Sequence, residues 1–401
     1  TVNQAMKRSN RWIRMKSNGD SEAEILKSFD EKTDMSVFTW KGEIDTILSP
    51  KDSILYYKQI LRAGLMSLEP QTGHVKAWVG GINYKHFQFD AVKQQKRQVG
   101  STFKPFVYAS AINQLKLSPC YKLPNIPYTI PKEKYDMPED WTPKNSDDKY
   151  GGELTLKEAL AGSVNVITAN LIDKVHPKTV VALAKSAGIK SDIPEVPAIA
   201  LGSVDLSLYE MVGAYATFAN KGLQIEPMMI LKIEDKNGTV LEQFIPTSKE
   251  VLSEESAYVV INLLEGVTQS GSGIRLRGKW GSYPDNVVTG YPYEFTNPIA
   301  GKTGTTQNQS DGWFMGIVPN LVTGVWVGGE DRATHFKSIT QGQGATMALP
   351  IWALYHKKIY ADATLNVSQG EFERPEDLSI EVDCGKKGDQ AIKQLEEDPE
   401  F

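Results

Sequence analysis

The segment 100–105, with the sequence GSTFKP, constrains this chain most, because it fixes the start of a helix and places two reactive side chains there. Gly100 permits a sharp entry into the helix. Pro105 lies among the first-turn residues, whose N–H groups lack intrahelical partners. Residues three apart share a helix face, so we expect Ser101 and Lys104 to lie together, near N–H groups that favour negative charge.

The pair of Ser101 and Lys104 is the first candidate site. A serine hydroxyl is a weak nucleophile at neutral pH, so acyl transfer needs a base within hydrogen-bond reach and donors for the developing oxyanion. The spacing alone is equally compatible with a serine that only caps the helix. Ser146 and Lys149 have the same spacing but lie in a polar segment with no apolar run behind it, so we interpret that match as coincidence.

A second motif, SVN at residues 163–165, follows a short predicted helix. Thr155 and Glu158 form a capping box that starts this helix, and a glycine then interrupts it. Residues two apart diverge on a continuous helix, whereas in a turn Ser163 and Asn165 can face one cleft. The alternative is that Ser163 caps the next helix, and the two interpretations are compatible.

The third motif is Lys302-Thr303-Gly304, which precedes two β-type segments. In an ideal pleat Lys302 and Gly304 point one way, and Thr303 and Thr305 the other. An edge strand here can offer its backbone to an extended peptide, while Gly304 leaves room for close approach. The alternative is a glycine-rich strand end without a function.

Taken in this order, the three motifs resemble the active-site set of penicillin-binding proteins and serine β-lactamases. Four further segments resemble the transpeptidase domain of class A penicillin-binding proteins: 68–73 (LEPQTG), 77–81 (AWVGG), 98–105 (QVGSTFKP) and 214–220 (AYATFAN). The resemblance extends from about residue 61 to about residue 360.

Local patterns and the resemblance together predict an α+β fold, with an antiparallel five-stranded sheet flanked by helices and a mostly helical subdomain. A hairpin of residues 64–68 and 74–79 is expected to join strands 313–318 and 321–327 in one sheet. A helix at 208–220 begins at a second capping box. Catalysis is expected at the seam between the sheet and the helices.

The chain is expected to have three regions. Residues 1–58 resemble the linker that precedes the catalytic domain in this family, residues 59–361 are the transpeptidase domain, and residues 362–401 are a polar, acidic tail expected to fray. A basic stretch near the N-terminus is interpreted as a solvated helix face rather than a membrane contact. The long irregular segment 123–150 is expected either to border the cleft or to be disordered.

The resemblance implies a role for five catalytic residues. Ser101 is the acylated nucleophile, Lys104 is its base, and Ser163 relays a proton toward the leaving amine. Asn165 holds the backbone of the substrate, and Lys302 adds positive potential. A second cation and partial burial both favour a neutral Lys104, which a base must be.

Binding of the substrate carboxylate is implied for the third motif. Thr303 and Thr305 contribute their hydroxyls, and Gly304 lies between them. The oxyanion donors implied by the resemblance are the backbone N–H groups of Ser101 and Thr305.

The implied activity is that of a D,D-transpeptidase, which cross-links peptidoglycan stem peptides through a serine acyl-enzyme and is acylated by β-lactams. A D,D-carboxypeptidase, and a β-lactam sensor or scaffold with the same fold, are the alternatives. The implied partners are a D-Ala-D-Ala donor, an amine acceptor and envelope activator proteins. A net charge of -5 disfavours nucleic acid, and five histidines without a His-Glu-x-x-His spacing disfavour a zinc site, so no cofactor or metal is expected.

One departure from hydrolytic relatives bears on the fate of the acyl-enzyme. Many serine β-lactamases carry Ser-Asp-Asn where this chain has residues 163–165, and they use an additional Glu to activate water. Between Ser163 and Lys302 no Glu is followed four residues later by Asn. The sequence therefore predicts a long-lived penicilloyl adduct.

Localisation is also inferred from the resemblance. No apolar stretch approaches the length needed to span a bilayer. Members of the family usually carry an N-terminal membrane anchor and a glycosyltransferase domain, so we expect an anchor-less fragment from the periplasmic face of a bacterial inner membrane. Cys120 and Cys384 are too few for a disulfide framework, and the sequence does not show whether they pair.

Overall fold

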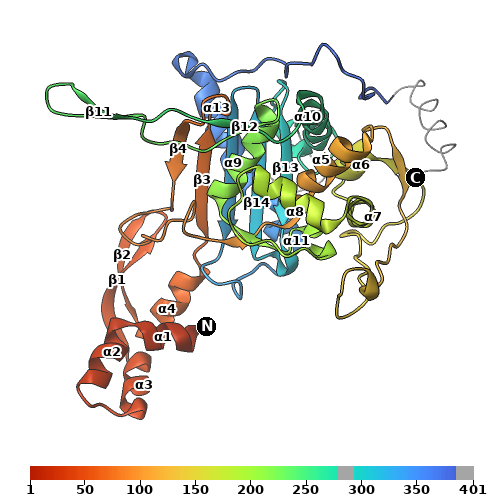
Figure 1. The fold of residues 1–401 in the computed structure, drawn as a ribbon. Helices are drawn as coiled ribbons and strands as arrows, with labels where there is room; N and C mark the ends of the chain where they lie inside the picture. The colour runs from red at the N-terminus through yellow and green to blue at the C-terminus, as the bar shows by residue number, and fades with distance from the viewer. Residues whose placement is uncertain (279–292, 385–401) are drawn as a thin grey trace.

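A five-stranded antiparallel sheet with the strand order β13-β14-β15-β3-β4 forms the centre of the protein, in a computed structural model that describes residues 1–278 and 293–384 (Figure 1). The strands are β3 (Arg62–Leu68), β4 (Val75–Val79), β13 (Ala300–Thr305), β14 (Asp311–Val318) and β15 (Leu321–Gly328). Every residue of β14 and β15 is buried, because helices cover both faces of the sheet. The predicted α+β fold with five antiparallel strands is confirmed.

The sheet joins two distant parts of the chain. β14 and β15 form a tight hairpin in which Val318 pairs with Leu321. β15 then pairs with β3, so that Val325 lies opposite Leu65, and β3 pairs with β4. The predicted union of the early hairpin with the strands after the third motif is therefore confirmed. It leaves β13, which carries that motif, at one edge of the sheet.

Helices form a layer on each face of the sheet. The principal helices are α5 (Lys104–Leu115), α6 (Leu156–Ala161), α7 (Asn165–Val175), α8 (Pro177–Ser186), α9 (Leu208–Ala219), α10 (Glu254–Gln269) and α13 (Leu349–Ala361). Phe314 and Met315 are adjacent in β14 yet belong to different buried clusters. One cluster includes Met211 of α9, and the other includes Trp352 of α13. The site described below lies where α5, α6 and α7 meet the edge of the sheet.

Short elements connect this framework. They are η1 (Gly100–Phe103), η2 (Lys132–Lys134), η3 (Pro197–Leu201), η4 (Ile274–Leu276), η5 (Gln307–Gln309), η6 (Ala363–Leu365), β5 (Arg97–Gln98), β6 (Lys122–Pro124), β7 (Glu153–Thr155), β8 (Asp205–Leu206), β9 (Leu223–Ile225), β10 (Lys232–Glu234), β11 (Val240–Gln243), β12 (Ser248–Glu250), α11 (Ile339–Gly342) and α12 (Gly344–Met347). Both predicted capping boxes are present, at the starts of α6 and α9.

The N-terminal region is a small unit of its own. It consists of α1 (Val2–Arg8), α2 (Asn10–Ser17), α3 (Glu22–Asp30), β1 (Thr33–Thr39), β2 (Gly42–Leu48) and α4 (Pro50–Gln59). A separate buried cluster of Met6, Trp12, Ile25 and Phe29 holds the helices together. Figure 1 shows this region projecting from the body of the protein.

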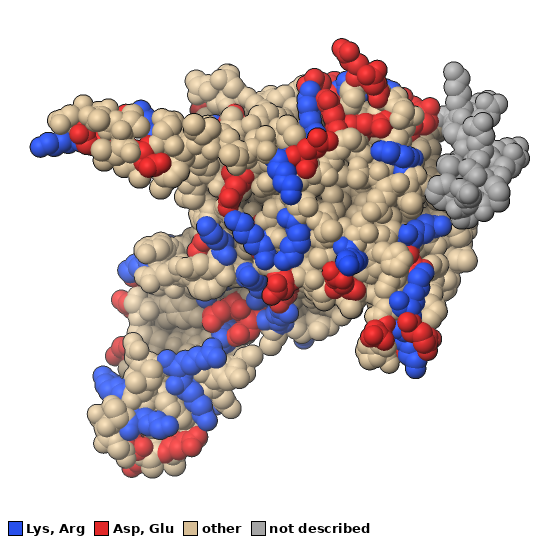
Figure 2. All heavy atoms as spheres, in the orientation of Figure 1, with Lys and Arg blue, Asp and Glu red and all other residues tan. Residues whose placement is uncertain are grey.

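Acidic and basic side chains are interspersed on the visible surface, as Figure 2 shows. The arm formed by β10 and β11 also projects from the body, and charged side chains lie among uncharged ones on it in this view (Figures 1 and 2). Its exposed apolar residues include Ile233 and Leu241. None of the described helices is both long and apolar enough to span a bilayer.

The prediction that the C-terminal segment frays is wrong for residues 366–384. Ile380 and Val382 are buried against the main core, and the Ser118 hydroxyl donates to the carbonyl of Glu381. A disulfide then joins Cys120 to Cys384, a pairing that the sequence left open. Apolar side chains and a covalent link therefore hold a segment whose composition is polar. The acidic end of the tail, 396–400, lies outside the described residues.

Loss of the disulfide is expected to destabilise the protein. A double variant, Cys120→Ser with Cys384→Ser, should unfold several degrees below the wild type, because the link closes a loop between residues 264 apart and such links commonly contribute about 2–4 kcal/mol. Calorimetry with and without a reductant measures this. The reductant should lower the Tm of the wild type and leave that of the double variant unchanged. Equal Tm values for the two proteins would contradict the expectation.

Candidate active site

The segment that carries Ser101 is built from a tight turn followed by a helix. Gly100 has a φ of 54°, a conformation that favours glycine, and it is the first residue of the short 3-10 helix η1. The helix α5 begins directly afterwards, at Lys104. A Cβ on Gly100 would lie 2.6 Å from the carbonyl oxygen of Thr305. The backbone next to Ser101 thus packs directly on the end of β13, and the first and third motifs meet there.

Lys104 connects the first motif to the second. Its side chain is fully buried, and its Nζ donates to the Ser163 carbonyl at 2.5 Å, the Ser163 hydroxyl at 3.2 Å and the Asn165 Oδ1 at 2.7 Å. Ser163 has a φ of 56°, which places both side chains of the motif toward one amine. The turn interpretation is therefore confirmed. The alternative of a Ser163 cap is wrong, because α7 begins at Asn165 with Val164 as its N-cap.

Lys302 joins the third motif to the same hydroxyl. It is fully buried in β13, and its Nζ donates to the Ser163 Oγ at 3.0 Å and to the Thr303 carbonyl at 3.1 Å. The Ser163 hydroxyl consequently lies between two lysine amines that are 198 positions apart in the sequence (302 − 104). An oxygen in this position can pass a proton from one side of the site to the other.

Burial controls the protonation of both lysines. Burial lowers the pKa of Lys104 well below its usual value, and the charge of Lys302 lowers that pKa further. Burial also lowers the pKa of Lys302, to about 7. Within residues 1–278 and 293–384, neither amine forms an ion pair with a carboxylate. Lys104 therefore loses its proton first and becomes a neutral amine beside a cation.

Ser101 is the predicted catalytic residue whose side chain lies outside this hydrogen-bond network. Its side chain is partly exposed, and among the described residues no hydrogen bond joins its hydroxyl to Lys104. Contacts between a nucleophile and its base are often long in free enzymes and tighten when substrate binds. Only Thr102 and Phe103 separate Ser101 from Lys104, so the two residues are three positions apart and stay close together at the start of α5.

The remaining residues of the third motif line the edge of the sheet. The hydroxyls of Thr303 and Ser272 are 2.6 Å apart, and the Thr305 hydroxyl accepts from the Gly344 N–H at 3.1 Å. A Cβ on Gly304 would lie 2.8 Å from the Val99 carbonyl, so only glycine lets β13 approach the turn before Ser101 this closely. The assignment of the Ser101 and Thr305 amides as oxyanion donors stays a prediction.

Two residues near the site were not among the predicted site residues. Asn145 accepts at its Oδ1 from the backbone N–H groups of Asn165 (3.0 Å) and Val166 (3.2 Å), so it caps α7 and fixes the second motif. It comes from the irregular segment 123–150, which thus borders the site. Ser272 follows α10 and contacts Thr303. Its only signal in the sequence is its place between two glycines.

Comparison with known proteins identifies the family of this chain. Residues 1–61 match the penicillin-binding protein middle domain, and residues 63–331 match the penicillin binding protein transpeptidase domain. Penicillin-binding protein 1A of Aquifex aeolicus (strain VF5) is 36% identical over 331 residues, which are 80% of this chain and 42% of that protein. The two matched regions meet near residue 62.

Solved structures show the same fold. A crystal structure of penicillin-binding protein 1A from Haemophilus influenzae superimposes with a TM-score of 0.66 at 27% identity, covering 79% of this chain and 49% of that one. The PonA1 protein from Mycobacterium tuberculosis in complex with penicillin V has the same fold, with a TM-score of 0.62 at 22% identity, covering 96% of this chain and 99% of that one.

The fold and the site define a penicillin-binding transpeptidase domain, a class of acyltransferase that acts in peptidoglycan synthesis. The chain belongs to the penicillin-binding protein transpeptidase family, and its similarity to penicillin-binding proteins 1A places it in class A, as the motifs suggested. It spans 42% of the Aquifex aeolicus relative and 49% of the Haemophilus influenzae chain.

The order in which the lysines lose their protons predicts the pH dependence of acylation by a labelled penicillin. The rate should rise as Lys104 loses its proton and fall as Lys302 loses its own, with the fall centred at a pH of about 7. In a Lys302→Arg variant the guanidinium stays charged, so the falling limb should disappear. Rates measured from pH 4 to pH 9 test this, and a falling limb unchanged in the variant would contradict the assignment.

Proposed function

We propose that this protein is a D,D-transpeptidase that cross-links peptidoglycan stem peptides through an acyl-enzyme on Ser101, and that β-lactams acylate the same oxygen. The observation that carries the proposal is the Ser163 hydroxyl held between Lys104 and Lys302, both fully buried. This arrangement supplies a neutral base, a proton path and a cation within one cleft. The structure of PonA1 in complex with penicillin V supports β-lactams as ligands of this fold.

In the acylation step, the Ser101 Oγ attacks the carbonyl carbon of the penultimate D-Ala, and a C–O bond forms while the hydroxyl proton passes to the Lys104 Nζ. The oxyanion accepts from the N–H groups of Ser101 and Thr305. The amide C–N bond then breaks. The leaving D-Ala amine takes a proton from the Ser163 Oγ, which is replenished by Lys104 through the contact at 3.2 Å.

In the transfer step, an acceptor amine attacks the acyl ester, a new C–N bond forms and the ester C–O bond breaks. The acceptor amine gives up a proton to the Lys104 Nζ, which returns it to the departing Ser101 oxygen. Earlier, in the acylation step, the hydroxyls of Thr303 and Thr305 hold the terminal carboxylate of the donor, with Lys302 adding positive potential, and this carboxylate departs with the leaving D-Ala. Asn165 is suited to hold the peptide backbone, because its Oδ1 and Nδ2 are already fixed by Lys104 and by the Lys144 carbonyl. The edge of β13 offers further backbone groups to an extended peptide.

The periplasmic face of the inner membrane is the proposed location. The disulfide between Cys120 and Cys384 supports an oxidising compartment. Peptidoglycan stem peptides are the proposed donor and acceptor partners, and envelope activator proteins are proposed from the class A membership alone.

A transfer assay tests the proposed activity. A synthetic stem peptide ending in D-Ala-D-Ala is incubated with the protein and a labelled D-amino acid as acceptor. Incorporation of the label, together with release of D-Ala, is the expected result. Release of D-Ala without incorporation at any acceptor concentration would instead identify a carboxypeptidase. Acylation by penicillin with neither product would identify a sensor.

Removal of the nucleophile or its base should abolish covalent labelling by penicillin. Ser101→Ala removes the acylated oxygen, so no labelled band is expected on a denaturing gel. Lys104→Ala removes the base, and a fall in acylation rate of about 10²- to 10⁴-fold is expected. Thermal unfolding of both variants serves as the control for folding. Full labelling of Lys104→Ala at neutral pH would contradict its role as base.

The penicilloyl adduct is expected to be long-lived. Between Ser163 and Lys302 no Glu is followed four residues later by Asn, so we expect no counterpart of the Glu that serine β-lactamases use to activate water, and deacylation should take many minutes to hours. Intact-protein mass spectrometry after removal of free penicillin measures the loss of the adduct. Rapid turnover of penicillin by the purified protein would show that a water-activating group is present.

A further inference from the structure

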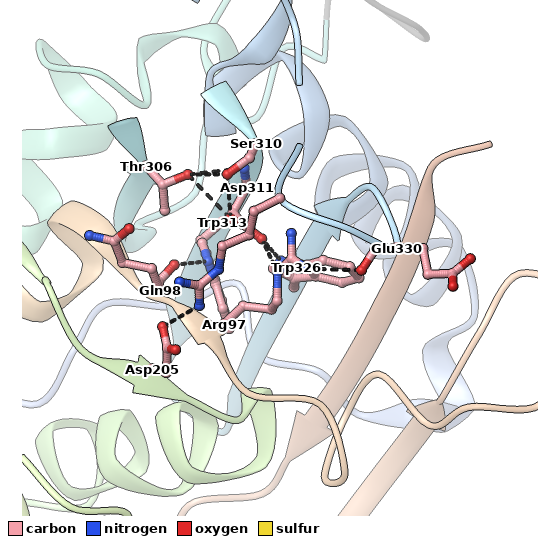
Figure 3. Close-up of polar contacts among 10 residues, drawn as sticks. Arg97, Gln98, Asp205, Thr306, Ser310, Asp311, Trp313, Trp326 and Glu330 are labelled. Carbon is pink, nitrogen blue, oxygen red and sulfur yellow. Dashed lines mark hydrogen bonds and ion pairs between the residues drawn. The ribbon is translucent and has the colours of Figure 1, made fainter. Parts of the chain in front are cut away.

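A buried ion pair lies beside the site but takes no part in the reaction described above. The Arg97 Nε donates to the Asp311 Oδ1 at 2.5 Å, and the two side chains are 8% and 0% exposed. Arg97 lies in β5, four positions before Ser101, and Asp311 is the first residue of β14, six positions after Thr305. Figure 3 shows the pair between these two segments.

Asp311 is held from every side. Its Oδ1 also accepts from the Trp326 indole N–H at 3.0 Å, and its Oδ2 accepts from the Ser310 hydroxyl at 2.8 Å and the Thr306 hydroxyl at 3.3 Å (Figure 3). These three donors hold the Asp311 carboxylate in a fixed orientation relative to β14, independently of its contact with Arg97. A buried charge with this many donors acts as a rigid anchor for the arginine.

Together with three further backbone contacts, the Arg97–Asp311 pair surrounds the predicted oxyanion donors. The Thr306 N–H donates to the Asp311 carbonyl at 3.2 Å, which ties the residue after Thr305 to β14. On the other side, the Trp313 indole N–H donates to the Gln98 carbonyl at 2.9 Å (Figure 3). Gly100 then packs against the carbonyl of Thr305. The pair thus joins the two backbone segments that contribute the two predicted N–H groups.

We propose that Arg97 and Asp311 are positioning residues that set the separation of the Ser101 and Thr305 N–H groups. Neither side chain touches the reacting atoms. A buried ion pair adds little net stability compared with apolar residues of the same size, but its geometry is directional. Arg97 also donates from Nη1 to the Glu330 carbonyl at 3.2 Å, so it contacts both the first residue of β14 and the segment that follows β15. This inference rests on the proposed function, because the oxyanion donors belong to that mechanism.

The test separates positioning from folding. Asp311→Asn keeps the shape of the side chain and removes its charge. Arg97→Lys keeps the positive charge but loses the hydrogen bond to the Glu330 carbonyl. Stopped-flow labelling with a fluorescent penicillin gives the dissociation constant and the acylation rate constant separately. Asp311→Asn is expected to lower the rate constant about 10- to 100-fold, since misplaced donors weaken binding of the oxyanion. The dissociation constant should change less than about threefold.

Glu210 supplies the matched control. Its buried carboxylate accepts from the N–H groups of Ser191 (2.7 Å) and Ser207 (3.0 Å) at the start of α9. Glu210→Gln should lower the Tm much as Asp311→Asn does, yet leave the acylation rate constant of the folded protein unchanged. The acylation rate constant of Arg97→Lys should lie between that of Asp311→Asn and that of the wild type.

Each outcome decides the inference. An unchanged rate constant in Asp311→Asn, or an equal loss in Glu210→Gln, would overturn it. If Asp311→Asn does not fold, Arg97→Lys carries the test, and a wild-type rate constant in that variant would overturn it as well. Absence of labelling in the wild type itself would contradict the proposed function instead, so the two failures are distinguishable.

Discussion

Two lysine side chains, Lys104 and Lys302, are fully buried on either side of one hydroxyl, that of Ser163. Withdrawing an ammonium group from water is costly, and two such groups in one site cannot both stay charged without carboxylate partners. The consequence is an amine that is neutral when its neighbour is still a cation. The fold brings these three side chains together from α5, the turn at Ser163 and β13.

The site is assembled from segments that have little structure in common. α5 supplies Lys104 at its first residue, a turn with a positive φ supplies Ser163, and the edge strand β13 supplies Lys302. β13 is in place only because β14 and β15 join the early strands β3 and β4 in one sheet. The helical layer and the sheet therefore have to be complete before the three motifs meet, which couples the chemistry to the global fold.

The sequence was a good guide where a physical rule acts locally. Capping boxes, the hairpin between β14 and β15 and the turn at Ser163 follow from short patterns, and each is present. Contacts between distant segments carry no such pattern. Asn145 reaches Asn165 from a segment with no periodicity, and the pairing of Cys120 with Cys384 depends on where the chain returns. The acidic composition of the tail predicted that it frays. A few apolar side chains, such as those of Ile380 and Val382, anchor the segment but hardly change its average composition.

The central claim is that Ser101, and not another hydroxyl of this cleft, becomes acylated. Peptide mapping of the penicilloyl protein tests it most directly. Trypsin does not cut readily between Lys104 and Pro105, so Ser101 lies in the peptide 98–116 together with Ser110. Tandem mass spectrometry should place the added mass on Ser101 in that peptide. An adduct on Ser110, or on the peptide that contains Ser163, would contradict the account.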